Sequence, residues 1–128
     1  MFFPLTKPLT AAVPQRRTRS PIRHPLGYGY IPLMHHPWGE ILTIIWHCYQ
    51  TSQPHCHQGS LNLTRVQTGR ILERKYRLAR GRLVVASERI LVAGQWTWTL
   101  PFQIHELIGL EDDTQTLHFY WPGRQTCA

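Results

Sequence analysis

The dominant pattern in this 128-residue sequence is a series of short runs rich in β-branched and aromatic residues, with turn residues between them. In one run Trp96, Trp98 and Leu100 alternate with threonines. Successive side chains of an extended strand point to opposite faces of a sheet, so a period of two indicates strands and not helices. Regularly spaced short strands are typical of barrels and sandwiches. We therefore expect an all-β domain.

The positions of these runs predict the strands. Residues 41–49 are almost continuously apolar, which predicts a strand that is buried on both faces and makes His47 a core histidine and not a ligand. Further strands are predicted at residues 55–58, 60–68, 70–78, 83–92, 95–100, 104–110 and 116–121. A chain of this length is enough for one hydrophobic core, so we expect a single domain.

The N-terminal region has a different composition. Residues 1–39 hold seven of the ten prolines. Proline fixes φ and removes a backbone donor, so long helices are not expected there. We predict that residues 1–27 form an irregular Pro/Arg-rich segment, poorly ordered or wrapping the barrel, and that residues 28–128 form the barrel.

The positive charge is concentrated in the same region. The net charge is +7, and residues 1–39 carry five basic residues and no acid, whereas the rest of the chain carries nine basic and seven acidic residues. A nucleic-acid surface requires basic residues clustered on the folded domain, interleaved with aromatic residues. We therefore expect no nucleic-acid partner. A basic nucleic-acid-associated barrel remains an alternative that rests on the tail charge alone.

Cysteine usage and hydropathy bear on the compartment. Cys48, Cys56 and Cys127 are odd in number and have no spacing typical of a disulfide framework, which favours a reducing compartment. No apolar run approaches the roughly 20 residues that cross a bilayer. Prolines interrupt the basic N-terminal segment, which disfavours a targeting helix. We expect a cytoplasmic protein that does not bind membranes.

Three histidines form a candidate metal site. Pro54 precedes His55-Cys56-His57, and an extended conformation places the two imidazoles on one face with Cys56 pointing the other way. A third histidine, His105, lies in a later predicted strand. Three imidazoles leave coordination positions open, as in a reactive site and unlike a closed structural one.

The last predicted strand carries a row of polar side chains. Thr116, His118 and Tyr120 share one face by the same period of two. A hydroxyl, an imidazole and a phenol in a row can form a hydrogen-bonded relay that points into a pocket. The alternative is a half-exposed polar face of an edge strand.

Taken together, these motifs resemble the thiol dioxygenases of the cysteine dioxygenase type, within the cupin superfamily. The resemblance extends from about Tyr28 to Cys127. It rests on His55-Cys56-His57 followed by Asn62 and Gly69, on Gly94, Leu100-Pro101 and His105, and on Thr116-Leu117-His118-Phe119-Tyr120-Trp121-Pro122. The resemblance implies a small cupin-type β-barrel, that is, a double-stranded β-helix or jelly roll.

The same resemblance implies an activity. His55, His57 and His105 would bind Fe(II), and Tyr120, His118 and Thr116 would form the catalytic relay beside it. The substrates would be dioxygen and a small thiol of the cysteine or 3-mercaptopropionate type, oxidised to its sulfinic acid in sulfur amino-acid metabolism.

Three positions depart from the family pattern. Cys56 replaces an aspartate, and Asn62 replaces the cysteine that some members crosslink to the catalytic tyrosine, so we expect no crosslink here. The arginine that anchors the substrate carboxylate falls at Tyr30, or at Pro32 with another gap placement; we assign Tyr30 to the substrate site. Either another arginine replaces the anchor in space, or the thiol has no carboxylate. The alternative function is a catalytically altered cupin that binds or senses a small molecule.

Overall fold

The computed structural model describes residues 21–24, 27–57 and 59–123. Over these residues the chain forms nine strands and no helix, which confirms the all-β prediction. The strands are β1 (Ile22–Arg23), β2 (Gly29–His36), β3 (Gly39–Trp46), β4 (Leu61–Thr68), β5 (Arg70–Ala79), β6 (Arg82–Val92), β7 (Trp96–Thr99), β8 (Ile104–Gly109) and β9 (Thr114–Trp121). No helix in the described part of the chain is long and apolar enough to cross a membrane.

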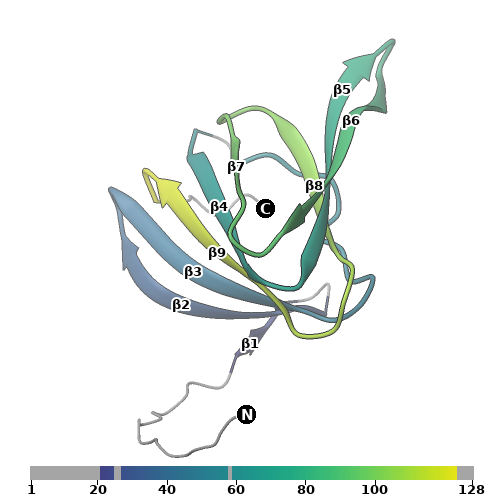
Figure 1. The fold of residues 1–128 in the computed structure, drawn as a ribbon. Coiled ribbons are helices and arrows are strands. Elements are labelled where there is room, and N and C mark those ends of the chain that lie inside the picture. Colours follow the sequence, from purple (N-terminus) through teal and green to yellow (C-terminus); the bar gives the residue numbers. More distant parts are fainter. Residues whose placement is uncertain (1–20, 25–26, 58, 124–128) are drawn as a thin grey trace, which may run out of the picture.

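The strands build two antiparallel sheets. One has the order β1-β2-β3-β9-β4-β7, and the other has the order β6-β5-β8. Figure 1 shows the sheets curving toward each other into a barrel, with the β5–β6 hairpin projecting beyond it. Strands far apart in sequence are neighbours, because β9 pairs with both β3 and β4. The last strand therefore lies at the centre of the larger sheet.

The strands of the larger sheet present one face to the barrel interior. In β3 the buried residues alternate with half-buried ones, and in β9 four polar or aromatic residues alternate in the same way. The apolar core is made of Leu42, Ile44, Trp46, Val66, Ile71, Leu91, Leu107 and Tyr120. Histidines, threonines and acids are buried beside it. Buried polar groups are stable only when they have hydrogen-bond partners. A cluster of such groups inside a domain is typical of a binding site.

The prediction for residues 41–49 was wrong in two respects. Only one face of β3 is fully buried, since Ile41, Thr43 and Ile45 on the other face remain half-buried. The strand also ends at Trp46, and the side chain of His47 is 61% exposed and not in the core. Two of the three outward residues, Ile41 and Ile45, are apolar, so hydrophobicity alone did not distinguish the two faces.

One further predicted strand also differs from the structure. Residues 55–57 do not form a strand, and residue 58 lies outside the described residues; His55 makes an isolated bridge to His105. Near the N-terminus the structure describes the short strand β1, while residues 1–20 and 25–26 lie outside the described residues, as do residues 124–128 with Cys127. Pro32 is tolerated in β2 because the strand bulges between Pro32 and Met34.

Gly69 forms the corner between the two sheets. It is the one residue between β4, in the larger sheet, and β5, in the smaller sheet. Its φ is +77°, a left-handed conformation that glycine adopts without a steric cost. A Cβ at this position would also lie 2.9 Å from Cα of Thr114. The glycine thus lets β4 turn sharply while β9 begins directly against it.

Candidate metal centre

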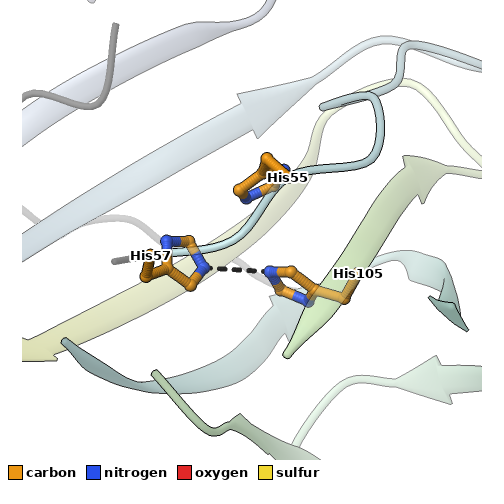
Figure 2. A group of neighbouring side chains, drawn as sticks. All are labelled: His55, His57 and His105. Carbon is orange, nitrogen blue, oxygen red and sulfur yellow. Dashed lines mark hydrogen bonds between the residues drawn. The ribbon is translucent and has the colours of Figure 1, made fainter. Parts of the chain in front are cut away.

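The three predicted histidines converge on one point inside the barrel. One nitrogen of each of His55, His57 and His105 lies within 4.8 Å of the others. Figure 2 shows His55 and His57 on the loop between β3 and β4, with His105 facing them from β8. Ring centroids are 4.8–5.0 Å apart for all three pairs. The bridge between His55 and His105 joins the loop to β8 and fixes this arrangement.

Two of the nitrogens have the spacing that a shared metal ion requires. Nε2 of His57 and Nε2 of His105 are 2.9 Å apart. Metal–imidazole bonds are about 2.0–2.1 Å long, so two nitrogens bound to one ion at a right angle lie about 3 Å apart. His57 and His105 are also 5% and 1% exposed, so the ion would be held away from bulk solvent. The residues present therefore fit a metal ion bound by three imidazoles.

The nitrogens that face away from this centre have partners of their own. Nδ1 of His55 lies 2.8 Å from the carbonyl oxygen of Gln53. Nδ1 of His105 lies 3.3 Å from the carboxylate of Glu73 and 3.2 Å from the hydroxyl of Thr99. An acceptor at Nδ1 places the ring proton there and leaves Nε2 with a free lone pair, which is how metal-binding histidines are oriented in proteins.

Glu73 is a buried carboxylate that orients His105, and the sequence analysis missed it. It is 1% exposed and accepts hydrogen bonds from Thr97 at 2.7 Å and from Arg89 at 3.4 Å. Burial raises the pKa of this carboxyl, but the hydrogen bonds from His105 and Thr97, with the charges of His105 and Lys75, bring the pKa below its ordinary value. Glu73 is therefore ionised and accepts from His105.

A signal for Glu73 was present in the sequence. Ile71 and Glu73 share the buried face of β5 by the period of two that was used for other strands. An acid in register with a core isoleucine must find a partner inside the domain, because an isolated buried carboxylate is too costly. The sequence could not identify that partner, since His105 comes from β8, 32 residues away.

The histidines open onto a cavity of about 450 Å³. Its polar and charged lining residues are His24, His35, Glu40, Ser52, His55, Cys56, His57, His105 and His118. Its aromatic and apolar lining residues are Tyr28, Tyr30, Leu42, Ile44, Trp46, Leu107 and Tyr120. The volume is in the range of small-molecule sites. Tyr30, assigned from the sequence to the substrate site, thus lines the cavity, and so does Cys56, although it was expected to point away from the imidazoles.

The predicted relay residues lie along the inner face of β9. Nε2 of His118 is 2.6 Å from the hydroxyl of Thr116, and Nδ1 is 3.0 Å from the hydroxyl of Thr64 on β4. The indole of Trp46 donates to Thr116 at 2.9 Å. His118, Thr116 and Thr64 are at most 2% exposed. The alternative of a half-exposed polar face on an edge strand is therefore wrong.

Tyr120 connects this row to the histidine cluster. Its ring centroid is 5.0 Å from that of His57, and its ring lies nearly parallel to that of His118 at 6.2 Å. The tyrosine is 4% exposed and lines the cavity. The phenol therefore lies between the candidate metal ligands and the buried His118.

The charge of the cavity lining differs from what the resemblance implies. Within the described ranges, no lysine or arginine lines the cavity. Among the described lining residues the one carboxylate is Glu40, which is 8% exposed and which no motif in the sequence indicated. The period of two in β3 places Glu40 on the same buried face as Leu42, so a signal for it was available.

No protein-family model matches the sequence, and no curated protein matches it. Solved structures do match the fold. A RmlC-like cupin from Shewanella frigidimarina has a TM-score of 0.69 at 13% identity, covering 91% of this chain and 95% of that one. A cupin 2 conserved barrel protein from Salinispora arenicola has a TM-score of 0.63 at 19% identity, covering 88% and 90%. A recombinant oxalate oxidase in complex with glycolate has a TM-score of 0.62 at 14% identity, covering 80% and 54%.

These likenesses show the fold and nothing finer, because all three identities are low. The two antiparallel sheets and the match to a cupin barrel over 91% of the chain support the same fold. The chain therefore folds as a cupin-type β-barrel, with three histidines inside it that could hold a metal ion.

Proposed function

We propose that this protein is a non-haem iron-dependent dioxygenase that oxidises a small thiol to its sulfinic acid. The observation that carries the proposal is the convergence of His55, His57 and His105 at the wall of a cavity that Tyr120 also lines. The motif resemblance supports thiol chemistry and Fe(II). The shared fold with an oxalate oxidase supports the capacity of such a barrel for oxidation, but not the substrate.

Neutral imidazole ligands suit this reaction. They add no negative charge, so the full charge of a bound divalent ion remains to favour a thiolate over a thiol. Bound ferrous iron would supply the redox chemistry that links the thiol and dioxygen. The balance is R–SH + O₂ → R–SO₂H: sulfur loses four electrons, dioxygen gains four, and no other reductant is needed.

The chain's own residues would position the reactants. Tyr120, whose ring contacts that of His57, would donate a hydrogen bond to the sulfur or to the oxygen atoms being transferred. Thr116 and Thr64 contact the two ring nitrogens of His118 and thereby fix the imidazole ring that stacks on Tyr120. Tyr30, on β2, lines the same cavity and would contact the substrate. Fixing both reactants in one small cavity replaces a bimolecular encounter with a local step.

Metal analysis and oxygen uptake test the proposal. The purified full chain is loaded anaerobically with Fe(II) and supplied with cysteine, 3-mercaptopropionate or cysteamine. We expect about one iron per chain, oxygen consumption with at least one thiol, and a product that carries both atoms of isotope-labelled dioxygen. An iron-loaded chain that consumes no oxygen with any of the three thiols contradicts the proposal.

A second candidate is a cupin that binds or senses a small molecule without turnover. The absence of lysine and arginine among the described lining residues favours it, because the anchor for a carboxylated substrate is missing. Saturable binding of a thiol to the iron-loaded chain without oxygen consumption would identify this function.

A further inference from the structure

We propose that two copies of this chain associate through the outer face of the larger sheet. The outer face is the set of side chains that β3, β9, β4 and β7 direct away from the barrel interior; the four strands lie side by side in this order (Figure 1). The proposal concerns the surface of the barrel and not its cavity, so it does not depend on the proposed function.

These strands carry polar residues inside the barrel and apolar residues outside. The register places Trp98 of β7, Leu63 of β4 and Phe119 of β9 in one row, which continues to Ile41 of β3. The buried residues of the adjacent inward row are Thr99, Asn62, Tyr120 and Glu40. An antiparallel sheet with one solvated face normally shows the opposite order, with apolar residues inside and polar residues outside. The reversal indicates that a partner covers the outer face.

The outer face exposes apolar area on the scale that a dimer needs. Trp96, Trp98 and Trp121 are 46%, 62% and 66% exposed. A whole tryptophan side chain presents about 250 Å², so the three indoles together present about 400 Å². A stable interface buries about 800 Å² on each partner, so the tryptophans alone supply about half of it. Leu63 and the half-buried side chain of Phe119 between them add to this area.

The charge of the outer face fits a second copy better than a nucleic acid. Within these four strands the face holds one charged side chain, Arg65, whose Cζ lies 5.9 Å from the ring centroid of Trp96. A stacking surface for nucleic acid combines aromatic rings with several cations that neutralise the phosphates. The chain as a whole is basic, with a net charge of +7. Two copies therefore repel each other least where they meet through this nearly uncharged face.

A two-fold contact suits the arrangement of side chains on this face. Two antiparallel sheets pack face to face about 10 Å apart, with their strands within about 30° of each other. In a two-fold dimer the same patch of both copies faces itself. Trp96 and Trp98 lie on the edge strand β7, whereas the shorter side chains of Leu63 and Leu117 lie on β4 and β9. An axis through the middle of the face would set the indoles of one copy over the leucines of the other.

A second group of exposed apolar residues lacks these properties. Leu78 and Leu83 are 67% and 44% exposed and oppose each other near the tip of the β5–β6 hairpin. Arg77, Arg80 and Arg82 are exposed beside them. The core of an interface is depleted in charged residues, and like charges that meet across it repel each other. Self-association through the hairpin tip is therefore disfavoured, and the hairpin serves as the control surface.

Sedimentation of the purified full chain tests the proposal. Analytical ultracentrifugation follows the mass as the concentration rises from about 1 to 100 μM, because interfaces of standard size bind at micromolar affinity or more tightly. We expect twice the mass of one chain at the upper end of this range. A chain that remains monomeric there overturns the inference, whatever else covers the face.

Trp98→Asp should dissociate the dimer. The substitution places a charge in the apolar row, and a two-fold contact contains it twice. Loss of one hot-spot tryptophan weakens an interface by about 30-fold, so we expect the dimer dissociation constant to rise by at least about 100-fold. Trp98→Phe keeps an aromatic ring and should remain dimeric. Because the side chain is mostly exposed, circular dichroism should show that both variants are folded.

Leu78→Asp is the matched control, because it places the same charge on an exposed apolar residue of the smaller sheet. We expect it to leave the dimer unchanged. A dimer that is lost in Leu78→Asp and kept in Trp98→Asp would place the interface on the hairpin and overturn the inference. Trp121→Asp, on β9, replaces Trp98→Asp if that variant does not fold, and an unweakened dimer in it is equally contrary to the proposal.

Discussion

The Nε2 atoms of His57 and His105 lie 2.9 Å apart, although the two residues are 48 positions apart in the chain. His57 lies in the loop after β3 of the larger sheet, and His105 lies in β8 of the smaller sheet. Two imidazole nitrogens at this distance share a proton or a cation, since two lone pairs repel each other. The closure of the barrel therefore creates the candidate metal centre, with histidines supplied from both sides.

His105→Ala should abolish metal binding. The ring supplies one of three ligands, and two imidazoles with water bind a divalent ion much more weakly. We expect iron to fall from about one per chain to less than about a tenth, measured by elemental analysis after dialysis, a loss consistent with removing one ligand of three. His47→Ala is the control, because His47 is exposed outside the cavity. Iron that remains stoichiometric in a folded His105→Ala variant would show that the ligands are misassigned.

Glu73→Gln should weaken metal binding without removing a ligand. The carboxylate fixes the orientation of His105 through Nδ1. Loss of such an outer partner typically reduces metal affinity about 10–100-fold. Competition with a chelator measures the affinity, and Glu88→Gln, which removes an exposed acid paired with Arg74, should leave it unchanged. An unaltered affinity in Glu73→Gln would mean that Thr99 alone orients the ring.

Tyr120→Phe should reduce turnover and leave iron binding unchanged. The substitution removes only the phenolic hydroxyl, so the ring contact with His57 is retained. A positioned proton donor contributes about 10²–10⁴-fold to a rate, and we expect a loss of kcat of at least about 100-fold. Tyr49→Phe is the matched control at a tyrosine that is 76% exposed. Full turnover by an iron-loaded Tyr120→Phe protein would exclude a role for the hydroxyl.

Gly69→Ala should destabilise the barrel more than Gly81→Ala. Both glycines have similar left-handed φ values, +77° and +76°. That conformation costs an alanine about 1–2 kcal/mol. At Gly81 an added Cβ meets nothing within 4 Å, whereas at Gly69 it would lie 2.9 Å from Cα of Thr114. Urea unfolding of both variants isolates the steric contribution, and equal losses would show that Thr114 moves aside.

Much of the site could be predicted from the sequence, because its residues lie in local patterns. His55 and His57 are two residues apart, and Thr116, His118 and Tyr120 follow the period of a strand; all but Thr116 line one cavity, and Thr116 holds His118. Residues 55–57 do not form the predicted strand. The loop nonetheless brings both histidines to the centre, because the bridge from His55 to His105 holds it against β8.

The sequence did not reveal which polar residues are inside the barrel. Glu40 and Glu73 are charged residues on strands, and such residues are usually solvated. Their burial depends on which face of β3 and of β5 turns inward, which is decided by pairing with β9 and β8. Arg89 reaches Glu73 only because β6 pairs with β5.

The sequence by itself determined the all-β class, the strand periodicity and the identity of the three imidazoles, because these depend on local spacing and residue type. Only the tertiary structure decided that the imidazoles meet, that Glu73 supports one of them and that the cavity beside them holds a carboxylate and no guanidinium in its described lining. The physical reason is that charge and distance inside a barrel arise from strands that pair across tens of residues, and no local pattern encodes that pairing.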